Sequence, residues 1–434
     1  MEQNDELIKE PESENSKNPD YQQVIKIANY VLKAKPIGKG SYGTVFLAKN
    51  ENNEYFAAKR IDLSLLESDK RLKEKFMSEA RLYHHLKSKH IIHLHDLQKT
   101  KNHIYLFLEY CDSETLESFL NKYQDVFNHL LSPSLLQFFV SQIVEGLSYM
   151  AAHNCIHRDL KPENIMTSST SNSLGKSNIN SIVLEEENIL KISLKKSLNT
   201  YNVFGKIIER PKYFDDDIIK DESVFENEIK KNIIKIIDLG FARELDNEGY
   251  AQSACGTPAF IAPEIFDALS GGKKFGQKVD LWSLGVTIYN LAFGKFPFNG
   301  PAPQKFMNEF KIGLYEIPNT PNVSLELIDI INGLLKRNVT RRYSWNHIIN
   351  HPFLIKDPKN FTKFDFQGKK SLTLNINDSL KVFIEKIVFV KQLTTEDGSP
   401  INKPTLFNPL RESTVDITNE LFYGEDDWAI VNLK

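Results

Sequence analysis

Short apolar runs separated by polar residues predict a β-rich region near the start of the chain. Runs with a strand-like pattern occupy residues 30–35, 45–49, 56–60 and 104–110. Between the last two runs, Phe76, Ala80, Tyr83 and Leu86 recur at helical spacing on one face of residues 67–86. The pattern therefore predicts strands around one amphipathic helix. An apolar run at residues 233–237 adds a buried strand much later in the chain.

One polar segment, His157-Arg158-Asp159-Leu160-Lys161-Pro162-Glu163-Asn164, concentrates reactive and metal-binding side chains. An aspartate can accept the proton of an attacking hydroxyl, a lysine can neutralise charge on a moving phosphate, and an asparagine can hold Mg²⁺. The segment resembles the catalytic loop of eukaryotic protein kinases. The resemblance implies an α+β, bilobal kinase fold over residues 26–354. It also implies that Asp159, Lys161 and Asn164 are the catalytic residues.

A glycine-rich segment stands between the first two predicted strands and consists of Gly38, Lys39, Gly40, Ser41, Tyr42, Gly43, Thr44 and Val45. The same glycine spacing occurs in dinucleotide-binding folds, where a helix follows it. Here a strand follows, and glycine lets the backbone amides of a hairpin lie over phosphates without side-chain clash. The pattern favours an ATP-binding loop of the kinase type over a dinucleotide site.

Residues 56–60 contain Lys59, and the helix predicted at 67–86 offers it an acidic partner. By the kinase resemblance, Lys59 would contact the α- and β-phosphates and Glu79 would orient it. Glu74 on the same helix is the competitor, but it is more typical of a solvated acidic residue. The other residues assigned to ATP are Ala57 over the adenine, Leu108 as gatekeeper, Glu109 and Cys111 through their backbone, and Met166.

Asp238-Leu239-Gly240 follows the apolar run at 233–237 and supplies the other half of an expected magnesium site. Kinases usually have phenylalanine where Leu239 stands. Leucine is also apolar and can pack beneath the helix that carries Glu79. The resemblance implies ATP and Mg²⁺ as cofactors, with Asn164 and Asp238 as the metal ligands.

The segment from Asp238 to Glu264 resembles a kinase activation segment. Thr257 before Pro258, together with Lys161 after Asp159, resembles the serine/threonine branch of the family rather than the tyrosine branch. Ser253 is expected to carry an activating phosphate that pairs with Arg158. Two further residues complete the large lobe by resemblance: Asp280 would brace the catalytic loop, and Arg342 would pair with Glu264.

Composition and charge narrow the class of protein. The 434 residues allow two to three domains, and a 41% hydrophobic fraction supports a sizeable core. The net charge of −3 gives no reason to expect nucleic acid or a membrane as a partner. Cys111, Cys155 and Cys255 are not spaced as metal ligands, and their odd number argues against a disulfide framework. Without an apolar leader or a long apolar run, a cytoplasmic location is expected, with the nucleus as the alternative.

Two segments depart from the composition of the rest. Residues 1–25 are rich in Glu, Asn, Ser and Lys and are expected to be a disordered acidic tail. Between Asn164 and Asp238 a kinase needs only a short hairpin, so residues 167–232 are interpreted as a low-complexity insertion. Insertions at hairpin tips cost little loop-closure entropy. The insertion is either a tolerated expansion or a regulatory or docking element.

The C-terminal part has a regular pattern of its own. Residues 361–366 and 371–376 alternate like two strands, with a turn at 367–370, and residues 380–390 are amphipathic. Further strand-like runs lie at 404–410 and 428–433. This order resembles a β-grasp, ubiquitin-like domain over residues 361–434, through which partners would dock. The alternative is an irregular tail packed on the kinase domain.

Two motifs bear on the kinase subgroup, and they indicate different families. Residues 236–246 resemble the same segment in the inhibitor-of-κB kinases, which also follow the kinase domain with a ubiquitin-like domain. The long helical scaffold of that family has no counterpart in this sequence. Pro297-Phe298 and the prolines after it partly resemble the autophagy-initiating kinases instead.

The expected reaction is the transfer of the γ-phosphoryl group of Mg-ATP to serine or threonine hydroxyls of protein substrates in intracellular signalling. Two rival functions remain. A pseudokinase would signal by binding alone, but Lys59, Glu79, Asp159, Asn164 and Asp238 are all present. A dinucleotide-binding enzyme is disfavoured by the strand that follows the glycine-rich segment.

Overall fold

The computed structural model describes residues 6–8, 24–39, 43–169, 200–203, 206–209, 221–246, 250–251, 256–271, 274–298, 313–319, 323–365 and 369–377. The chain divides into two units, Met1–Asn377 and Asp378–Lys434, and every described residue belongs to the first. The strand-like runs at 404–410 and 428–433 and the amphipathic run at 380–390 therefore lie outside the described residues. So do Gly40, Ser41, Tyr42 and Ser253.

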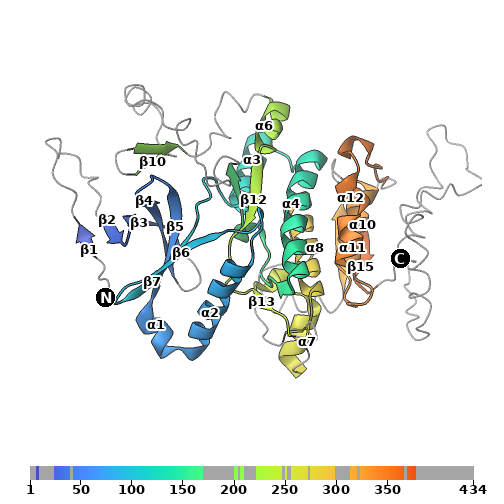
Figure 1. The fold of residues 1–434 in the computed structure, drawn as a ribbon. Helices are drawn as coiled ribbons and strands as arrows, with labels where there is room; N and C mark the ends of the chain where they lie inside the picture. The colour runs from blue at the N-terminus through green and yellow to red at the C-terminus, as the bar shows by residue number, and fades with distance from the viewer. Residues whose placement is uncertain are drawn as a thin grey trace, which may run out of the picture. The chain divides into compact units, whose positions relative to one another are not determined.

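The small lobe is built on an antiparallel sheet in the order β1-β2-β3-β4-β5-β7-β6 (Figure 1). Its strands are β1 (Glu6–Ile8), β2 (Val24–Ile27), β3 (Tyr30–Lys39), β4 (Thr44–Asn50), β5 (Tyr55–Asp62), β6 (Leu94–Lys99) and β7 (His103–Glu109). The four runs predicted from the apolar pattern correspond to β3, β4, β5 and β7. These predictions are confirmed.

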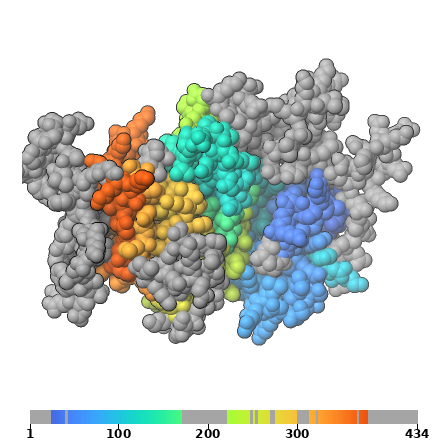
Figure 2. Space-filling model, turned by 180° about the vertical axis from the view of Figure 1, so that it is seen from behind, coloured from blue at the N-terminus to red at the C-terminus, as the bar shows by residue number. Residues whose placement is uncertain are grey.

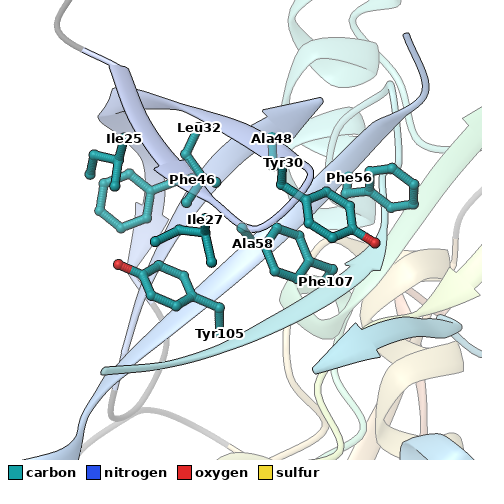
Figure 3. Close-up of a cluster of buried hydrophobic side chains, with 10 residues drawn as sticks. All are labelled: Ile25, Ile27, Tyr30, Leu32, Phe46, Ala48, Phe56, Ala58, Tyr105 and Phe107. Carbon is teal, nitrogen blue, oxygen red and sulfur yellow. The ribbon is translucent and has the colours of Figure 1, made fainter. Parts of the chain in front are cut away.

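Aromatic and aliphatic side chains from β2, β3, β4, β5 and β7 form the core of this sheet (Figure 3). Tyr30 stacks on Phe107 with ring centroids 3.7 Å apart, and Phe56 meets Tyr30 edge-on at 5.3 Å. Ala48 and Ala58 are fully buried among these rings. Burying several aromatic rings stabilises a small lobe of this size and holds β5 in a fixed register.

The predicted helix at 67–86 forms as two pieces, α1 (Leu63–Ser68) and α2 (Lys70–His85). Asp69 separates them because its carboxylate accepts hydrogen bonds from the backbone N–H groups of Arg71 and Leu72, which caps α2. Phe76, Glu79 and Tyr83 are buried on the inner face of α2. The helix therefore presents Glu79 to the sheet.

The large lobe is mainly helical. Its helices are α3 (Leu116–Phe127), α4 (Pro133–Ala152), α6 (Glu222–Ile229), α7 (Pro263–Gly271), α8 (Lys278–Phe293), α10 (Leu325–Leu334), α11 (Trp345–Ile349) and α12 (Pro352–Ile355). Short 3₁₀ turns occur at η1 (Pro162–Asn164), η3 (Pro258–Phe260) and η4 (Pro358–Asn360). Figure 2 shows the small lobe (blue) and the last described residues (orange) at opposite ends, with these helices between them.

Helix α4 is the central helix of this lobe. By length and composition alone it could cross a membrane, but 56% of its apolar window is buried within the protein. Phe139, Val140, Ile143 and Leu147 along it are fully buried. These contacts are those of a core helix in a helical lobe.

The N-terminal tail differs from the prediction. Within residues 1–25, expected to be disordered, β1 pairs with β2, and Val24 and Ile25 are buried in the sheet. The reason is that β2 extends the sheet at β3 and leaves an edge whose backbone groups another strand can pair with.

The insertion also has different limits from those predicted at 167–232. Strands β9 (Ile165–Ser169) and β12 (Asn232–Ile236) pair in register from Ile165 with Ile236 to Ser169 with Asn232. Helix α6 then lies just before β12, with Phe225 fully buried. The ends of the predicted insertion are thus part of the folded lobe, because β-pairing and burial continue beyond the hairpin that the sequence indicated. Within the insertion, β10 (Thr200–Val203) pairs with β11 (Lys206–Glu209).

The hairpin predicted at 361–376 is wrong. Strand β15 (Ser371–Asn375) pairs instead with β14 (Leu314–Pro318), an element of the large lobe, and Lys363 bridges to Ser324. Phe364, Leu374 and Ile376 are buried there. Residues 361–377 therefore start no separate domain, as a ubiquitin-like domain at 361–434 would require. They pack on the first unit, and residues 378–434, the rest of the predicted ubiquitin-like domain, lie outside the described residues.

Candidate active site

Lys59 and Glu79 meet between the sheet and α2. In the β4–β5–β7 ladder, Lys59 stands opposite Val45 and Leu106, and its Nζ lies 2.6 Å from Glu79 Oε1. Burial raises the pKa of Glu79 and the nearby Asp238 raises it further, while burial lowers the pKa of Lys59. At this distance the two groups compensate each other as an ion pair. The structure thus selects Glu79 over Glu74, which is exposed on α2.

The glycine-rich segment is a hairpin between β3 and β4, with Gly38 opposite Val45 and Lys39 opposite Thr44. A strand follows it, as a kinase-type loop requires. Gly43 is obligatory by geometry, because a Cβ there would lie 2.6 Å from the carbonyl oxygen of Arg60. Glycine at position 43 therefore allows the hairpin to pack closely against β5.

The segment expected to hold adenine begins at the end of β7. Leu108 stands opposite Ala57 in the β5–β7 ladder. The N–H of Glu109 donates to the carbonyl of His93 at 2.8 Å, so only its carbonyl is left to meet adenine. Cys111 is buried, and burial raises the pKa of its thiol well above the ordinary range.

A buried ion pair that the sequence did not indicate fixes this segment to the large lobe. Lys235 Nζ on β12 lies 2.7 Å from Glu109 Oε1, and both side chains are nearly inaccessible. Met166 on β9 stands opposite Lys235 and also bridges to Thr115 at the start of α3. Met166 therefore lies where the segment after β7, which is expected to hold adenine, meets the large lobe. This position is consistent with the assignment of Met166 to the ATP site.

Asp159 accepts four hydrogen bonds from two sides. Its Oδ1 accepts from the Thr257 backbone N–H at 2.8 Å and from the Thr257 hydroxyl at 2.7 Å. The Asn164 amide donates to Oδ2 at 2.9 Å and to the Asp159 carbonyl at 2.8 Å. Lys161 Nζ lies 3.5 Å from Oδ2 and donates to the Thr257 hydroxyl at 2.7 Å. From the sequence, Thr257 was interpreted only as a feature of serine/threonine kinases. Its contact with Asp159 was not predicted.

The catalytic loop rests on Asp280 of α8. Its two carboxylate oxygens accept the backbone N–H groups of His157 at 2.7 Å and Arg158 at 2.8 Å. Burial raises the pKa of Asp280, and the neighbouring His157 opposes the shift. Arg158 has a left-handed backbone, with φ of 67°. The bracing contact predicted from the sequence is present and holds an unfavourable conformation in place.

The predicted pairing of Arg342 with Glu264 is also present. The guanidinium and carboxylate form two parallel hydrogen bonds of 2.6 and 2.9 Å, with Arg342 fully buried. Such a bidentate pair fixes the end of the activation segment to the base of the lobe.

The start of the activation segment is tied to both lobes. Arg158 Nε donates to the Phe241 carbonyl at 2.7 Å, and Lys75 Nζ on α2 lies 3.8 Å from the centre of the Phe241 ring. Farther on, a Cβ at Gly256 would come 2.5 Å from the Arg158 carbonyl oxygen, so glycine is required for this close approach. Ser253, the predicted phosphorylation site, lies outside the described residues and stays a prediction.

Asp238 and Asn164 offer the oxygen ligands that Mg²⁺ prefers. Asn164 directs its amide N–H groups at Asp159, which leaves the amide oxygen for a metal. Asp238 accepts the Gly240 N–H at 2.9 Å through Oδ1 and keeps a second oxygen. The residues present fit a metal that takes most of its other ligands from phosphate and water.

A comparison with protein-family models matches residues 31–179 and 215–354 to the protein kinase domain. The chain belongs to the protein kinase family. The two matched parts include strands β4, β5, β6 and β7, the catalytic loop and the activation segment. Residues 180–214, which separate the two matched parts, fall within the predicted insertion.

Similar proteins carry kinase names. The chain is 25% identical to "Serine/threonine-protein kinase apg-1" of Neurospora crassa over 91% of its own length and 40% of the relative. It is 27% identical to "Serine/threonine-protein kinase ATG1c" of Arabidopsis thaliana over 76% of its length and 36% of the relative. "Serine/threonine-protein kinase ATG1" of Debaryomyces hansenii is 27% identical over 78% and 36%. The kinase chain thus spans well under half the length of these relatives.

These relatives do not support the resemblance to inhibitor-of-κB kinases. They are named for ATG1 or apg-1, as the partial resemblance to autophagy-initiating kinases indicated. The segment at 236–246 that suggested the other subgroup surrounds Asp238, where all kinases need similar residues. Similarity there carries little information about subgroup.

Proposed function

We propose that this kinase domain transfers the γ-phosphoryl group of ATP to serine and threonine hydroxyls of protein substrates. The observation that supports it most is the environment of Asp159. Thr257 and Asn164 hold its two carboxylate oxygens, and Lys161 lies beside them. A carboxylate fixed in this way can orient an acceptor hydroxyl and take its proton.

The other residues divide into two tasks. Lys59, held by Glu79, would bind the α- and β-phosphates from the small-lobe side. Lys161 would neutralise charge on the transferring group from the large-lobe side. Such a reaction needs mainly positioning and charge stabilisation. The buried ion pair and the braced catalytic loop both limit motion at the reacting groups.

Asn164 and Asp238 would hold Mg²⁺, which supplies charge neutralisation to the phosphates when bound. Asp238 lies close enough to Lys59 and Glu79 for its charge to affect the pKa of both. Tyr83, one turn after Glu79 on α2, also bonds the backbone on both sides of Asp238, at Ile237 and Leu239. This arrangement supports a shared role in holding the triphosphate.

A pseudokinase is the alternative function, and the described geometry disfavours it. A scaffold that only binds partners has no need for the pairing of Lys59 with Glu79 or for the double hydrogen bond of Thr257 to Asp159. Both are present here.

The assignment of serine and threonine as the phosphate acceptors is supported by the names of the relatives and by the contact of Lys161 with Thr257. We place the domain with ATG1-type kinases and expect it to act on intracellular proteins. Residues 378–434, in the part of the chain expected to dock partners, lie outside the described residues.

A transfer assay followed by phosphoamino-acid analysis tests the proposal. The purified chain, γ-labelled ATP, Mg²⁺ and a generic protein acceptor should yield phosphoserine and phosphothreonine. Asp159→Asn serves as the matched control because it keeps the size of the side chain. Label in phosphotyrosine alone, or equal label with the control, would contradict the proposal.

A further inference from the structure

Asp112 lies directly after Cys111, in the segment after β7 that is expected to hold adenine, and only 9% of it is exposed. Its Oδ1 accepts the backbone N–H of Ser169 at 2.9 Å, and its Oδ2 accepts the Ser169 hydroxyl at 2.5 Å. The hydroxyl of Ser168, which is fully buried, donates to Oδ1 at 3.4 Å. Hydrogen bonds to both oxygens compensate a buried carboxylate for the loss of water.

The two serines end β9, and the residue before them contacts the same segment. The N–H of Thr167 donates to the carbonyl of Glu114 at 3.1 Å. The hydroxyl of Thr167 forms a hydrogen bond of 2.8 Å with the hydroxyl of Ser113. The end of β9 is therefore bound along residues 112–114, the stretch of chain that leads from the adenine segment to α3.

One hairpin holds the adenine segment at both of its ends. The ion pair of Lys235 with Glu109 joins the end of β7 to β12, and Asp112 joins the later part of the segment to β9. Strands β9 and β12 pair with each other as far as Ser169 opposite Asn232. The insertion continues the chain from this end of the hairpin. The residues that contact Asp112 are therefore also those from which the insertion departs.

The other end of the insertion is attached to α3, the helix that follows the adenine segment. Phe225 of α6 is fully buried, and its ring packs edge-on against Phe127 of α3 with centroids 5.2 Å apart. Figure 1 shows α6 beside α3 and close to β12. Both ends of the insertion thus contact one continuous stretch of chain, residues 112–127.

We propose that Asp112 is a positioning residue for ATP binding, which acts through Ser168 and Ser169 and couples the nucleotide site to the base of the insertion. The inference rests on the proposed kinase activity. A segment already held in the arrangement that binds adenine loses less conformational entropy when ATP binds. Without the contacts of Asp112, only part of the population has this arrangement, and the apparent affinity for ATP falls in proportion.

Calorimetric titration of the whole chain with Mg-ATP tests the role of Asp112. Asp112→Ala should raise the Kd about three- to tenfold. Asp112→Asn keeps the size of the side chain and one accepting oxygen, so its Kd should lie between those of the wild type and the alanine variant. In steady-state transfer, KM for ATP should rise in parallel, while kcat and KM for the acceptor stay unchanged. Asp125→Ala, at an exposed aspartate of α3, is the matched control and should keep every constant.

A double-mutant cycle shows whether Asp112 acts through the end of β9. Ser169→Ala removes one of the donors and should raise the Kd less than Asp112→Ala does. The double variant should bind Mg-ATP as Asp112→Ala alone does, because both changes break the same contact.

Hydrogen exchange measures the coupling from the opposite direction, since a coupling between two sites is reciprocal. Bound Mg-ATP should slow exchange of the Ser169 N–H, which donates to Asp112, in the wild-type protein. The same addition should slow it less in Asp112→Ala. A residue with a structural role alone would not make exchange at Ser169 depend on nucleotide.

The outcomes separate this inference from the proposed activity. A wild-type Kd in Asp112→Ala, additive effects in the double variant, or exchange at Ser169 that ATP does not slow would overturn the inference and leave the kinase activity standing. A parallel change in kcat and in KM for the acceptor would also overturn it. If Asp112→Ala is insoluble, Ser169→Ala decides: a raised Kd supports the role, and a wild-type Kd overturns it. Absence of Mg-ATP binding by the wild type would overturn both proposals.

Discussion

The Tyr83 hydroxyl on α2 donates a hydrogen bond to the carbonyl of Ile237, 3.0 Å away. The same hydroxyl accepts the N–H of Leu239 at 3.4 Å, so it bonds the backbone on both sides of Asp238. Tyr83 is buried, and burial together with Glu79 and Asp238 raises the pKa of its hydroxyl, which stays protonated. The helix that orients Lys59 is thereby joined to the predicted metal ligand.

Tyr83→Phe should uncouple these two elements. The ring still fills its space, but the Ile237 carbonyl loses its donor, at a cost of about 1–3 kcal/mol if no water replaces it. We expect a lower melting temperature and a several-fold higher Mg²⁺ requirement for transfer. Thermal unfolding and a Mg²⁺ titration measure both. Tyr123→Phe, a similar deletion of a buried tyrosine hydroxyl on α3, should leave the Mg²⁺ titration unchanged.

Thr257 should matter for turnover rather than for ATP binding. Thr257→Val removes the hydroxyl that bonds Asp159 and Lys161 while keeping the shape of the side chain. We expect kcat to fall about tenfold or more because the acceptor-orienting carboxylate loses one of its anchors. Thr257→Ser keeps the hydroxyl and should retain most of the activity. Equal kcat for the valine and serine variants would show that the backbone N–H alone positions Asp159.

Most of the small lobe could be predicted from the sequence because its strands and its helix follow from the pattern of neighbouring residues. Short apolar runs defined β3, β4, β5 and β7, and the helical spacing of Phe76 and Tyr83 predicted the helix. Glu79 was assigned through the kinase resemblance. Contacts between distant segments were invisible in such patterns. The strand at 371–375 has a clear β pattern, yet nothing in that pattern names β14 as its partner.

The candidate site shows the same difference between local motifs, which the sequence reveals, and contacts between distant segments, which it does not. The kinase resemblance assigned Lys59, Asp159, Asn164 and Asp238 to the site, since each belongs to a recognisable motif. The ion pair of Lys235 with Glu109 was missed because charged residues are usually solvated. A charged residue within an apolar run, as Lys235 is, was the available signal of a buried partner.

The limits of the insertion lead to a deletion test. Removing residues 170–220 and joining the ends by a short turn should leave a soluble kinase that binds ATP, because the β9–β12 ladder and α6 remain. Removing residues 167–232, as the sequence alone suggested, should give insoluble or inactive protein. That deletion takes away Phe225 and the paired ends of the hairpin. Solubility, ATP binding and transfer measure the difference, and equal behaviour of both deletions would refute the structural role of α6.

Two cysteines should be inert toward alkylation at neutral pH. Burial raises the pKa of the Cys111 thiol far above the assay range and that of Cys155 to about 12. The reactive thiolate forms only as pH rises toward the pKa, so a raised pKa suppresses it at pH 7–8. Iodoacetamide on native protein followed by peptide mapping should leave both residues unmodified, whereas denatured protein should react at both. Complete modification of Cys111 in the native protein would show that the segment after β7 opens to solvent.

The central claim is that Asp159, held by Thr257 and Asn164, performs the transfer step on ATP positioned by Lys59. Single-turnover transfer from γ-labelled ATP, measured beside ATP binding, tests it most directly. Asp159→Asn should bind Mg-ATP within about twofold of wild type and transfer at least about 10²-fold more slowly. Lys59→Arg should fold normally and lose a comparable amount of turnover, because its forked group cannot reproduce the reach of the ammonium. Transfer by both variants at the wild-type rate would contradict the account.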